Sequence, residues 1–195
     1  MTASQLIHET IVTTRRADRG AHIVPLGIRH QGDLIVLAPF RPSATLENVL
    51  RERCAVVNFT DDVRVFAGCL TGRHAWPTVS AERVSCPRLA ASLAHTELEL
   101  VQVEEDEQRP RLLCRPVLSA NHGAFCGFNR AQAAVVEACI LVSRLSMLPE
   151  EKVRREMDYL AIAISKTAGP RELEAWNWLQ ERIDRFAAER RQETP

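Results

Sequence analysis

The sequence predicts an α+β protein, with an antiparallel β-barrel in residues 1–126 and a three-helix subdomain in residues 127–195. Runs rich in β-branched residues, separated by short turns, occupy the first part. From Asn129 onward the apolar residues recur with a period near 3.6. Gly123 and Gly127 lie between the two patterns, where the chain can turn sharply at small steric cost. Strands followed by helices are typical of an α+β architecture.

The elements of the barrel follow from these runs. A short helix is expected at residues 45–53, where the apolar residues have helical spacing. Residues 61–71 fit both a helix face, through Val63, Phe66 and Leu70, and a strand-like alternation, and we favour the helix. Strands are expected at residues 5–14, 21–30, 34–38, 54–60, 93–104 and 111–120.

The three helices of the second part each have a recognisable start. Asn129 is a suitable N-cap for the first helix, which is mostly apolar. Pro149 opens the second helix, and Gly169 with Pro170 opens the third. Trp176 lies on the apolar stripe of the third helix and is expected in its core.

Composition excludes several classes of protein. The chain has 195 residues, 46% of them hydrophobic, and no stretch approaches the roughly 20 apolar residues that span a membrane. Residues 1–126 hold 14 basic and 14 acidic residues and residues 127–195 hold 11 of each, so no basic excess indicates a nucleic-acid partner. The first residues lack the basic start and apolar run of a secretory signal, so we expect a cytoplasmic protein.

Motifs for the common enzyme classes are absent. The sequence has no phosphate-binding glycine loop, no nucleophile elbow and no zinc-protease helix. Its histidines occur singly, and its six cysteines include no Cys-x-x-Cys pair, so we expect no metal site and small buried thiols. No catalytic side chain is identified. Asp61 and Asp62 would suit a magnesium ion or a general base, but capping of the following helix is the favoured interpretation.

The segment 40–48 has an anion-binding composition. Arg41, Ser43, Thr45 and Asn48 lie just before or within the first turns of the expected helix. Free backbone N–H groups and hydroxyl donors favour a phosphate there, and a guanidinium can neutralise it. Ordinary capping by Ser43 or Thr45 is the alternative.

A second feature interrupts the expected strand 21–30. Val24, Pro25, Leu26 and Gly27 combine a proline, which frees a backbone edge, with a glycine, which permits close approach of a flat ligand. The alternative is that Pro25 marks a strand edge or a bulge and nothing more.

Together these segments resemble a known group. The patterns that carry the resemblance are His22-x-x-Pro25-x-Gly27, Ser43-x-Thr45-x-x-Asn48 and Val56-Val57-Asn58, which resemble the FMN-binding split barrels of the flavin reductase-like group. Two further runs make the chain similar to the domain of unknown function 447 family, over nearly its whole length: Asn58-Phe59-Thr60-Asp61-Asp62 and Gly127-Phe128-Asn129-Arg130-Ala131.

The resemblance implies an FMN-binding split β-barrel that forms a homodimer, with the flavin in a groove at the subunit interface. It implies that the phosphate contacts Arg41, Ser43, Thr45 and Asn48, and that residues 24–28 line the isoalloxazine ring. It further places Asn58 and Thr60 near the ribityl chain or the phosphate. The chain departs from the usual pattern at His22, where an asparagine is common, and at Gly27, where many flavin reductases have serine.

Arg130 is a separate candidate, because a cation in the first turn of a helix meets the positive end of the dipole. We expect it to reach an anionic group: the FMN phosphate, a carboxylate such as Asp61, or a substrate. The function expected is that of an FMN-dependent oxidoreductase acting on an unknown small molecule, which the resemblance links to methanopterin-dependent one-carbon metabolism. The alternatives are a non-catalytic flavin- or phosphate-ligand-binding module, acting as a sensor or carrier, and a protein that only assembles with partners.

Overall fold

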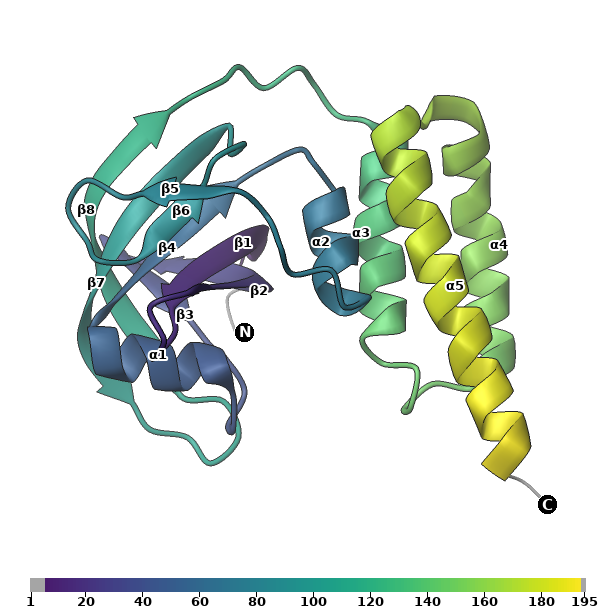
Figure 1. Cartoon of the computed structure of the whole chain (residues 1–195), viewed down its shortest axis with the longest axis horizontal. Coiled ribbons are helices and arrows are strands. Elements are labelled where there is room, and N and C mark those ends of the chain that lie inside the picture. The colour runs from purple at the N-terminus through teal and green to yellow at the C-terminus, as the bar shows by residue number, and fades with distance from the viewer. Residues whose placement is uncertain (1–5, 194–195) are drawn as a thin grey trace. The chain divides into compact units, whose positions relative to one another are not determined.

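A barrel and a helical bundle make up the computed structural model, which describes residues 6–193 (Figure 1). The described residues through Thr60, together with Ala75–Phe125, form the barrel unit. Asp61–His74 and the described residues from Cys126 onward form the helical unit. We keep residues 1–126 and 127–195 as the proposed domains along the chain, although the segment 61–74 lies with the helices.

The barrel is antiparallel, as the sequence predicts, and it is closed, with its strands in the order β1-β2-β3-β8-β7-β4. Residue 5, in the first expected strand, lies outside the described residues. The strands are β1 (His8–Arg15), β2 (Ala21–Gln31), β3 (Leu34–Leu37), β4 (Cys54–Phe59), β7 (Ala94–Glu104) and β8 (Arg111–Asn121).

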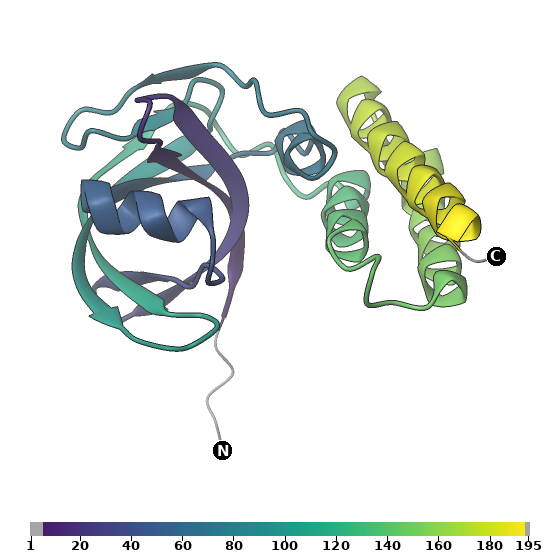
Figure 2. The ribbon, with the colours of Figure 1, turned by 60° about the horizontal axis from the view of Figure 1, so that its bottom comes forward.

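Alternation along the strands directs one set of side chains inward. The barrel core includes Val12, Ile28 and Leu98, each fully buried. Helix α1 (Ala44–Glu52) adds Leu46 and Val49 to the same core and lies across the barrel (Figure 2). This packing fixes the start of α1 relative to the strands.

A small hairpin, β5 (Thr78–Ser80) with β6 (Pro87–Leu89), covers part of the outer face of the barrel and was not expected from the sequence. Each strand has three residues, too few to show a period. Cys86, just before β6, packs with Cys54 and Val56 of β4 in a second core cluster. The hairpin therefore buries outward-facing residues of the barrel.

The helical unit contains α2 (Arg64–Leu70), α3 (Arg130–Val142), α4 (Glu150–Thr167) and α5 (Pro170–Glu193). The helix favoured over residues 61–71 is confirmed, and its buried residues explain why it lies against α3 and α5. Asn129 caps α3, as predicted, by accepting hydrogen bonds from the backbone N–H groups of Ala131 and Gln132 at 2.8 and 3.2 Å. Trp176 is buried in α5, also as predicted.

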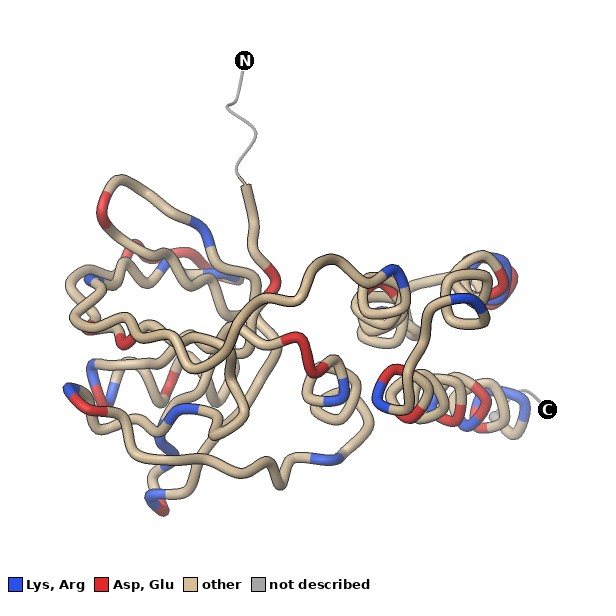
Figure 3. Tube along the Cα trace, turned by 90° about the horizontal axis from the view of Figure 1, so that it is seen from above, with Lys and Arg blue, Asp and Glu red and all other residues tan. Residues whose placement is uncertain are grey.

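Charged residues of both signs are interspersed along each unit (Figure 3). Among the described helices, none is both long enough and apolar enough to cross a membrane. The described residues also contain no group of three or more His, Cys, Asp or Glu side chains placed to hold a metal ion.

Candidate functional site

One edge of β2 is open along most of its length. β1 pairs with β2 from Ala21 to Ile28, whereas β3 pairs with β2 only from Ile28 to Gln31. No described strand pairs with the second edge between Ala21 and Gly27. A proline, which cannot donate a ladder hydrogen bond, is tolerated at such an edge, and this explains Pro25.

The start of α1 lies beside this open edge. The imidazole Nε2 of His22 and the hydroxyl Oγ1 of Thr45 are 3.0 Å apart. Ser43 is the N-cap of α1, and its hydroxyl accepts a hydrogen bond from the N–H of Leu46 at 3.3 Å. The strand that carries the second feature of the sequence therefore meets the segment 40–48, through His22 and Thr45. We call the open edge of β2 (Ala21–Gly27) together with residues 41–45 the β2–α1 site.

Side-chain directions limit what the edge can offer. Val24 and Leu26 pack against the barrel core. The hydroxyl of Thr10 donates a hydrogen bond to the carbonyl oxygen of Leu26 at 2.8 Å. A ligand along this edge would meet the backbone of residues 24–27 and the ring of Pro25, not the apolar side chains.

Glycine at position 27 has a local packing reason. A Cβ added there would lie 2.7 Å from Cγ2 of Ile7 and 3.7 Å from a carboxylate oxygen of Glu9. Since contacts under 3.0 Å force something to move, a larger residue at position 27 would displace the side chain of Ile7, whereas the distance to Glu9 is an ordinary van der Waals contact. Packing against Ile7 therefore favours glycine at this position without any ligand.

Arg41 lies at the exposed end of the site. Its guanidinium forms an ion pair with Glu105 at 2.9 Å, and both side chains are largely solvent-exposed. Such a pair contributes at most about 1 kcal/mol to stability. An anion of higher charge can therefore compete with Glu105 for Arg41 at small cost.

Two predicted ligand residues, Asn48 and Asn58, direct their amides into the protein. Asn48 donates to the hydroxyl of Thr14 at 3.0 Å and accepts from Arg51 at 2.9 Å. Asn58, fully buried, donates to the carbonyl oxygen of Ile11 at 3.0 Å. A flavin contact by the amide of Asn58 would have to replace one of its bonds, and the ligand role of both residues stays a prediction.

The two remaining predicted ligand residues are Thr60 and Arg130. Thr60 is half-buried in the loop after β4. Arg130 is the exposed first residue of α3 and belongs to the helical unit, whereas the β2–α1 site belongs to the barrel unit. The ligand roles of Thr60 and Arg130 therefore also stay predictions.

Of the acidic pair after β4, Asp62 contacts the start of α2, although the N-cap residue itself is Val63 and makes no side-chain capping hydrogen bond. Asp62 is buried, accepts a hydrogen bond from the backbone N–H of Arg64 at 3.2 Å, and forms an ion pair with the guanidinium of Arg64 at 2.7 Å. Burial acts to raise the pKa of Asp62, but the hydrogen bonds and charge of Arg64 outweigh it and hold the pKa below its ordinary value.

Replacing Asp62 by asparagine is expected to lower the free energy of unfolding of the helical unit by about 1–3 kcal/mol at pH 7. Because the pKa of Asp62 is lowered in the folded state, its contribution is present above the pKa of the unfolded chain and is lost as the pH falls. Urea unfolding of both proteins at pH 7 and pH 3 measures this. A difference that persists undiminished at pH 3 would contradict the ion-pair explanation.

A buried polar cluster that the sequence did not reveal lies on the outer face of the barrel. The carboxylate of Glu97 accepts hydrogen bonds from the backbone N–H groups of Glu82, Arg83 and Val84 at 2.7–3.0 Å. It also lies 3.1 Å from Nε2 of His95, whose Nδ1 is 2.8 Å from Nε2 of the exposed His122. Alternation of His95 and Glu97 on one strand face was the available signal, but nothing in the sequence shows that the β5–β6 segment covers that face.

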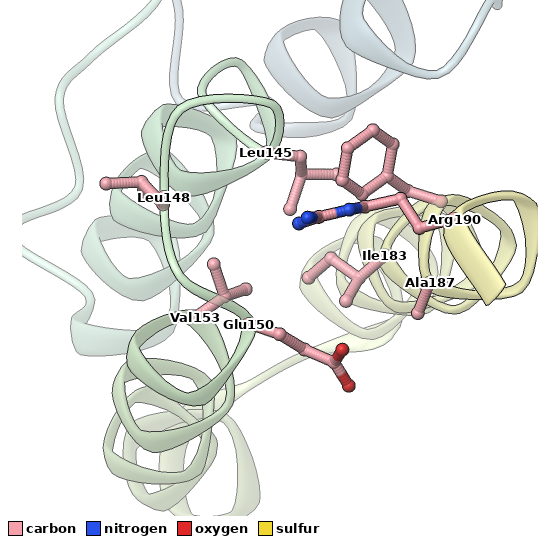
Figure 4. Close-up of a pocket in the computed structure, with 8 residues that line it drawn as sticks. Leu145, Leu148, Glu150, Val153, Ile183, Ala187 and Arg190 are labelled. Atoms are coloured by element: carbon pink, nitrogen blue, oxygen red, sulfur yellow. The ribbon is translucent and has the colours of Figure 1, made fainter. Parts of the chain in front are cut away.

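A separate hollow lies within the helical unit, between the start of α4 and the second half of α5 (Figure 4). Leu145, Leu148, Val153 and Ile183 give it an apolar lining, with Glu150 and Arg190 nearby. This lining supplies packing surface and no pair of groups arranged for catalysis.

Two family models match the chain over most of its length. The N-terminal domain of the protein family of unknown function DUF447 matches residues 8–122, and the second DUF447 model matches residues 129–181. The chain belongs to the DUF447 family. No curated protein matches it.

Solved structures share the fold of this DUF447 protein. An FMN-bound DUF447 protein from Methanosarcina mazei is 23% identical, with a TM-score of 0.78, and the match covers 92% of this chain and 96% of that one. The 2-nitrobenzoate 2-nitroreductase of Pseudomonas fluorescens is 16% identical, with a TM-score of 0.53, over 62% of this chain and 67% of that one. The flavin reductase component of a bacterial two-component tryptophan halogenase is 16% identical, with a TM-score of 0.51, over 62% and 84%. The DUF447 chain therefore has the α+β split-barrel fold predicted for it.

Proposed function

We propose that this DUF447 protein binds FMN at the β2–α1 site and acts as an oxidoreductase of the flavin reductase-like type. The observation that carries the proposal is the meeting of the open edge of β2 with the start of α1, through His22 and Thr45. The related Methanosarcina mazei structure is described as FMN-bound, which supports FMN as the ligand.

The residues present fit the two ends of FMN. Ser43 and Thr45, the free backbone N–H groups at the start of α1, and the exposed guanidinium of Arg41 suit a phosphate. The backbone of residues 24–27 at the open edge suits a flat ring that needs hydrogen-bond partners along its rim. FMN, when bound, would supply the electron-transfer chemistry, while the chain positions the ring and neutralises the phosphate.

The finer parts of the proposal rest on the family resemblance. We propose a homodimer with the flavin at the subunit interface, a small-molecule substrate linked to methanopterin-dependent one-carbon metabolism, and a cytoplasmic location. Arg130, Asn48, Asn58 and Thr60 are proposed as additional contacts to the cofactor. The second candidate function is a non-catalytic flavin-binding module that acts as a sensor or carrier.

The test is an absorbance spectrum of the purified protein followed by titration with FMN. The double variant Arg41→Ala/Thr45→Ala is expected to weaken FMN binding on the order of 100-fold, because it removes a charge-assisted contact and a hydroxyl contact to the phosphate. The matched control is Arg115→Ala/Thr78→Ala, which removes an exposed ion-paired arginine and a threonine elsewhere in the barrel unit.

Each outcome decides a separate point. Failure of the unmodified protein to take up FMN would refute the proposed function. Equal affinity in the unmodified protein and in the double variant would refute the β2–α1 site while retaining flavin binding. Bound FMN that no pyridine nucleotide or other reductant reduces would favour the binding module over the oxidoreductase.

A further inference from the structure

Two cysteines that are far apart in the sequence meet where the β5–β6 segment covers the barrel. Cys54 is the first residue of β4, and Cys86 directly precedes β6. Their sulfur atoms are 3.0 Å apart, and both residues are buried. The contact between Cys54 and Cys86 therefore links the β5–β6 segment, which we call the cover, to strand β4 of the barrel.

The surroundings of the pair divide it into a thiolate and a thiol. The hydrogen bond between the two sulfur atoms, with contacts from the hydroxyl of Ser85 and from nearby backbone N–H groups, outweighs burial and lowers the pKa of Cys54 to about 6. The same hydrogen bond, burial, and the negative charges of Cys54 and Glu52 raise the pKa of Cys86. At neutral pH Cys54 is therefore the nucleophile and Cys86 holds the proton.

Three other cysteines of the chain lack this property. Burial raises the pKa of Cys69, Cys114 and Cys139 to about 12 in each case. These thiols stay protonated at neutral pH and react slowly with oxidants. Cys114 is a suitable internal reference, because it is fully buried within the same barrel unit.

Residues 82–86, which cover the two cysteines, are held to the barrel by hydrogen bonds and form a single layer of chain. The N–H groups of Glu82, Arg83 and Val84 donate to the carboxylate of Glu97, and the hydroxyl of Ser85 lies 3.3 Å from the sulfur of Cys54. Three consecutive N–H groups and the neighbouring hydroxyl therefore hold this segment against Glu97 and Cys54. Glu82, Arg83 and Ser85 of this segment are exposed to solvent. Only this short loop therefore separates the two sulfur atoms from the solvent.

We propose that Cys54 and Cys86 are a reversible oxidation site at which a peroxide converts the two thiols to a disulfide. The Cys54 thiolate attacks one peroxide oxygen, the O–O bond breaks, and Cys54 becomes a sulfenic acid while hydroxide leaves. The sulfur of Cys86 then attacks the Cys54 sulfur, the S–O bond breaks, and the departing hydroxide takes the proton of Cys86 as water. The hydroxide of the first step takes up from solvent the proton that Cys54 lost on ionisation, so two thiols are oxidised and one peroxide is reduced to two waters. A small thiol reverses the reaction by exchange.

The disulfide would fasten the cover to β4. Closing the chain between positions 54 and 86 restricts the unfolded state and opposes local opening of the segment. The N–H groups of Glu82, Arg83 and Val84 should therefore exchange their hydrogens more slowly in the oxidised protein. The inference concerns the outer face of the barrel and does not depend on flavin binding.

The experiment uses the full chain with Cys126→Ser, which removes an exposed thiol that would otherwise link two molecules. Samples treated with hydrogen peroxide are denatured, alkylated, digested and analysed by mass spectrometry. We expect a peptide pair linked through Cys54 and Cys86, lighter by two hydrogens than the reduced pair, to form at least about tenfold faster than any oxidation of Cys114. The rate should rise with pH through about 6 and then level off, because the pKa of Cys54 is about 6. A small thiol should restore both alkylation sites.

A matched variant separates a reacting pair from two thiols that only pack together. In Cys86→Ser/Cys126→Ser, oxidation is expected to stop at a sulfenic acid on Cys54, which dimedone traps. If that variant does not fold, the linked peptide and the exchange of residues 82–84 in the Cys126→Ser protein decide the matter. Oxidation of Cys54 and Cys114 at equal rates, or a Cys54 sulfinic acid with Cys86 still free, would overturn the proposal.

Discussion

Replacing Glu97 by alanine is expected to lower the free energy of unfolding of the barrel unit by about 3–5 kcal/mol. The carboxylate is fully buried and accepts hydrogen bonds from three consecutive backbone N–H groups. Its removal leaves these N–H groups without their acceptor and leaves a cavity under the segment 82–84. Urea unfolding monitored by far-ultraviolet circular dichroism measures the loss.

Position 99 offers a matched control on the same strand. Glu99 lies on β7 and forms an ion pair with Arg115 in which both side chains are exposed, so Glu99→Ala should cost less than about 1 kcal/mol. Glu97→Gln keeps the size of the side chain and should fall between the two alanine variants. A loss below about 1 kcal/mol for Glu97→Ala would show that the segment 82–84 is not held by this carboxylate.

The pH dependence of the Glu97 contribution follows from its hydrogen bonds. Burial acts to raise the pKa of Glu97, but the N–H groups of Glu82 and Arg83, His95 and the N–H of Val84 together lower it below its ordinary value. A lowered pKa in the folded state gives stability that is present above the pKa of the unfolded chain and is lost as the pH falls. The difference between the unmodified protein and Glu97→Gln should therefore shrink below about pH 4.

The sequence was sufficient for the regular elements of the fold because each shows its own period over several residues. The strand at 111–120 and the helix from Asn129 are long enough for alternation or helical spacing to be unambiguous. Even the ambiguous segment 61–71 is a helix in the structure, where Val65, Phe66 and Ala67 are buried. The three-residue strands β5 and β6 show no period, so the hairpin that covers the outer face was not predictable.

The candidate site was predicted only to the level of residue type and spacing. Spacing placed Ser43 and Thr45 at the start of a helix, and this is their position in the structure. Spacing cannot show that Asn48 and Asn58 use their amides inside the barrel, because the partners lie 34 and 47 positions away. The same reason hid the contact between Cys54 and Cys86, since intervals between cysteines carry no information on pairing across a sheet.

Replacing Asn58 is expected to cause the second large loss of stability, because its side-chain amide both donates and accepts buried hydrogen bonds. Its Nδ2 donates to the carbonyl oxygens of Ile11 and Val56 and to the hydroxyl of Thr13, at 3.0–3.3 Å. Its Oδ1 accepts from the backbone N–H of Leu89 at 2.8 Å, which fastens β6 to the barrel. Removing the amide with Asn58→Ala should cost about 3 kcal/mol, because several buried polar groups lose their partner.

The aspartate variant tests the direction of these bonds. Asn58→Asp keeps an acceptor for Leu89 but places a buried carboxylate against two carbonyl oxygens, so its pKa in the folded state must rise above the unfolded value. Stability of this variant is then best below the unfolded pKa and falls as the pH rises, with a loss of about 3–5 kcal/mol at pH 8.

Urea unfolding at pH 5 and pH 8 measures the effect, with Asn121→Asp at the exposed end of β8 as the matched control. The control should change little between the two pH values, because its carboxylate is solvated. If Asn58→Asp were equally stable at both, the amide of Asn58 would not be directed at the carbonyl oxygens of Ile11 and Val56. Asn58 would then be free to turn toward a bound ligand, and the structural role argued for it would give way to the cofactor role that the sequence predicted.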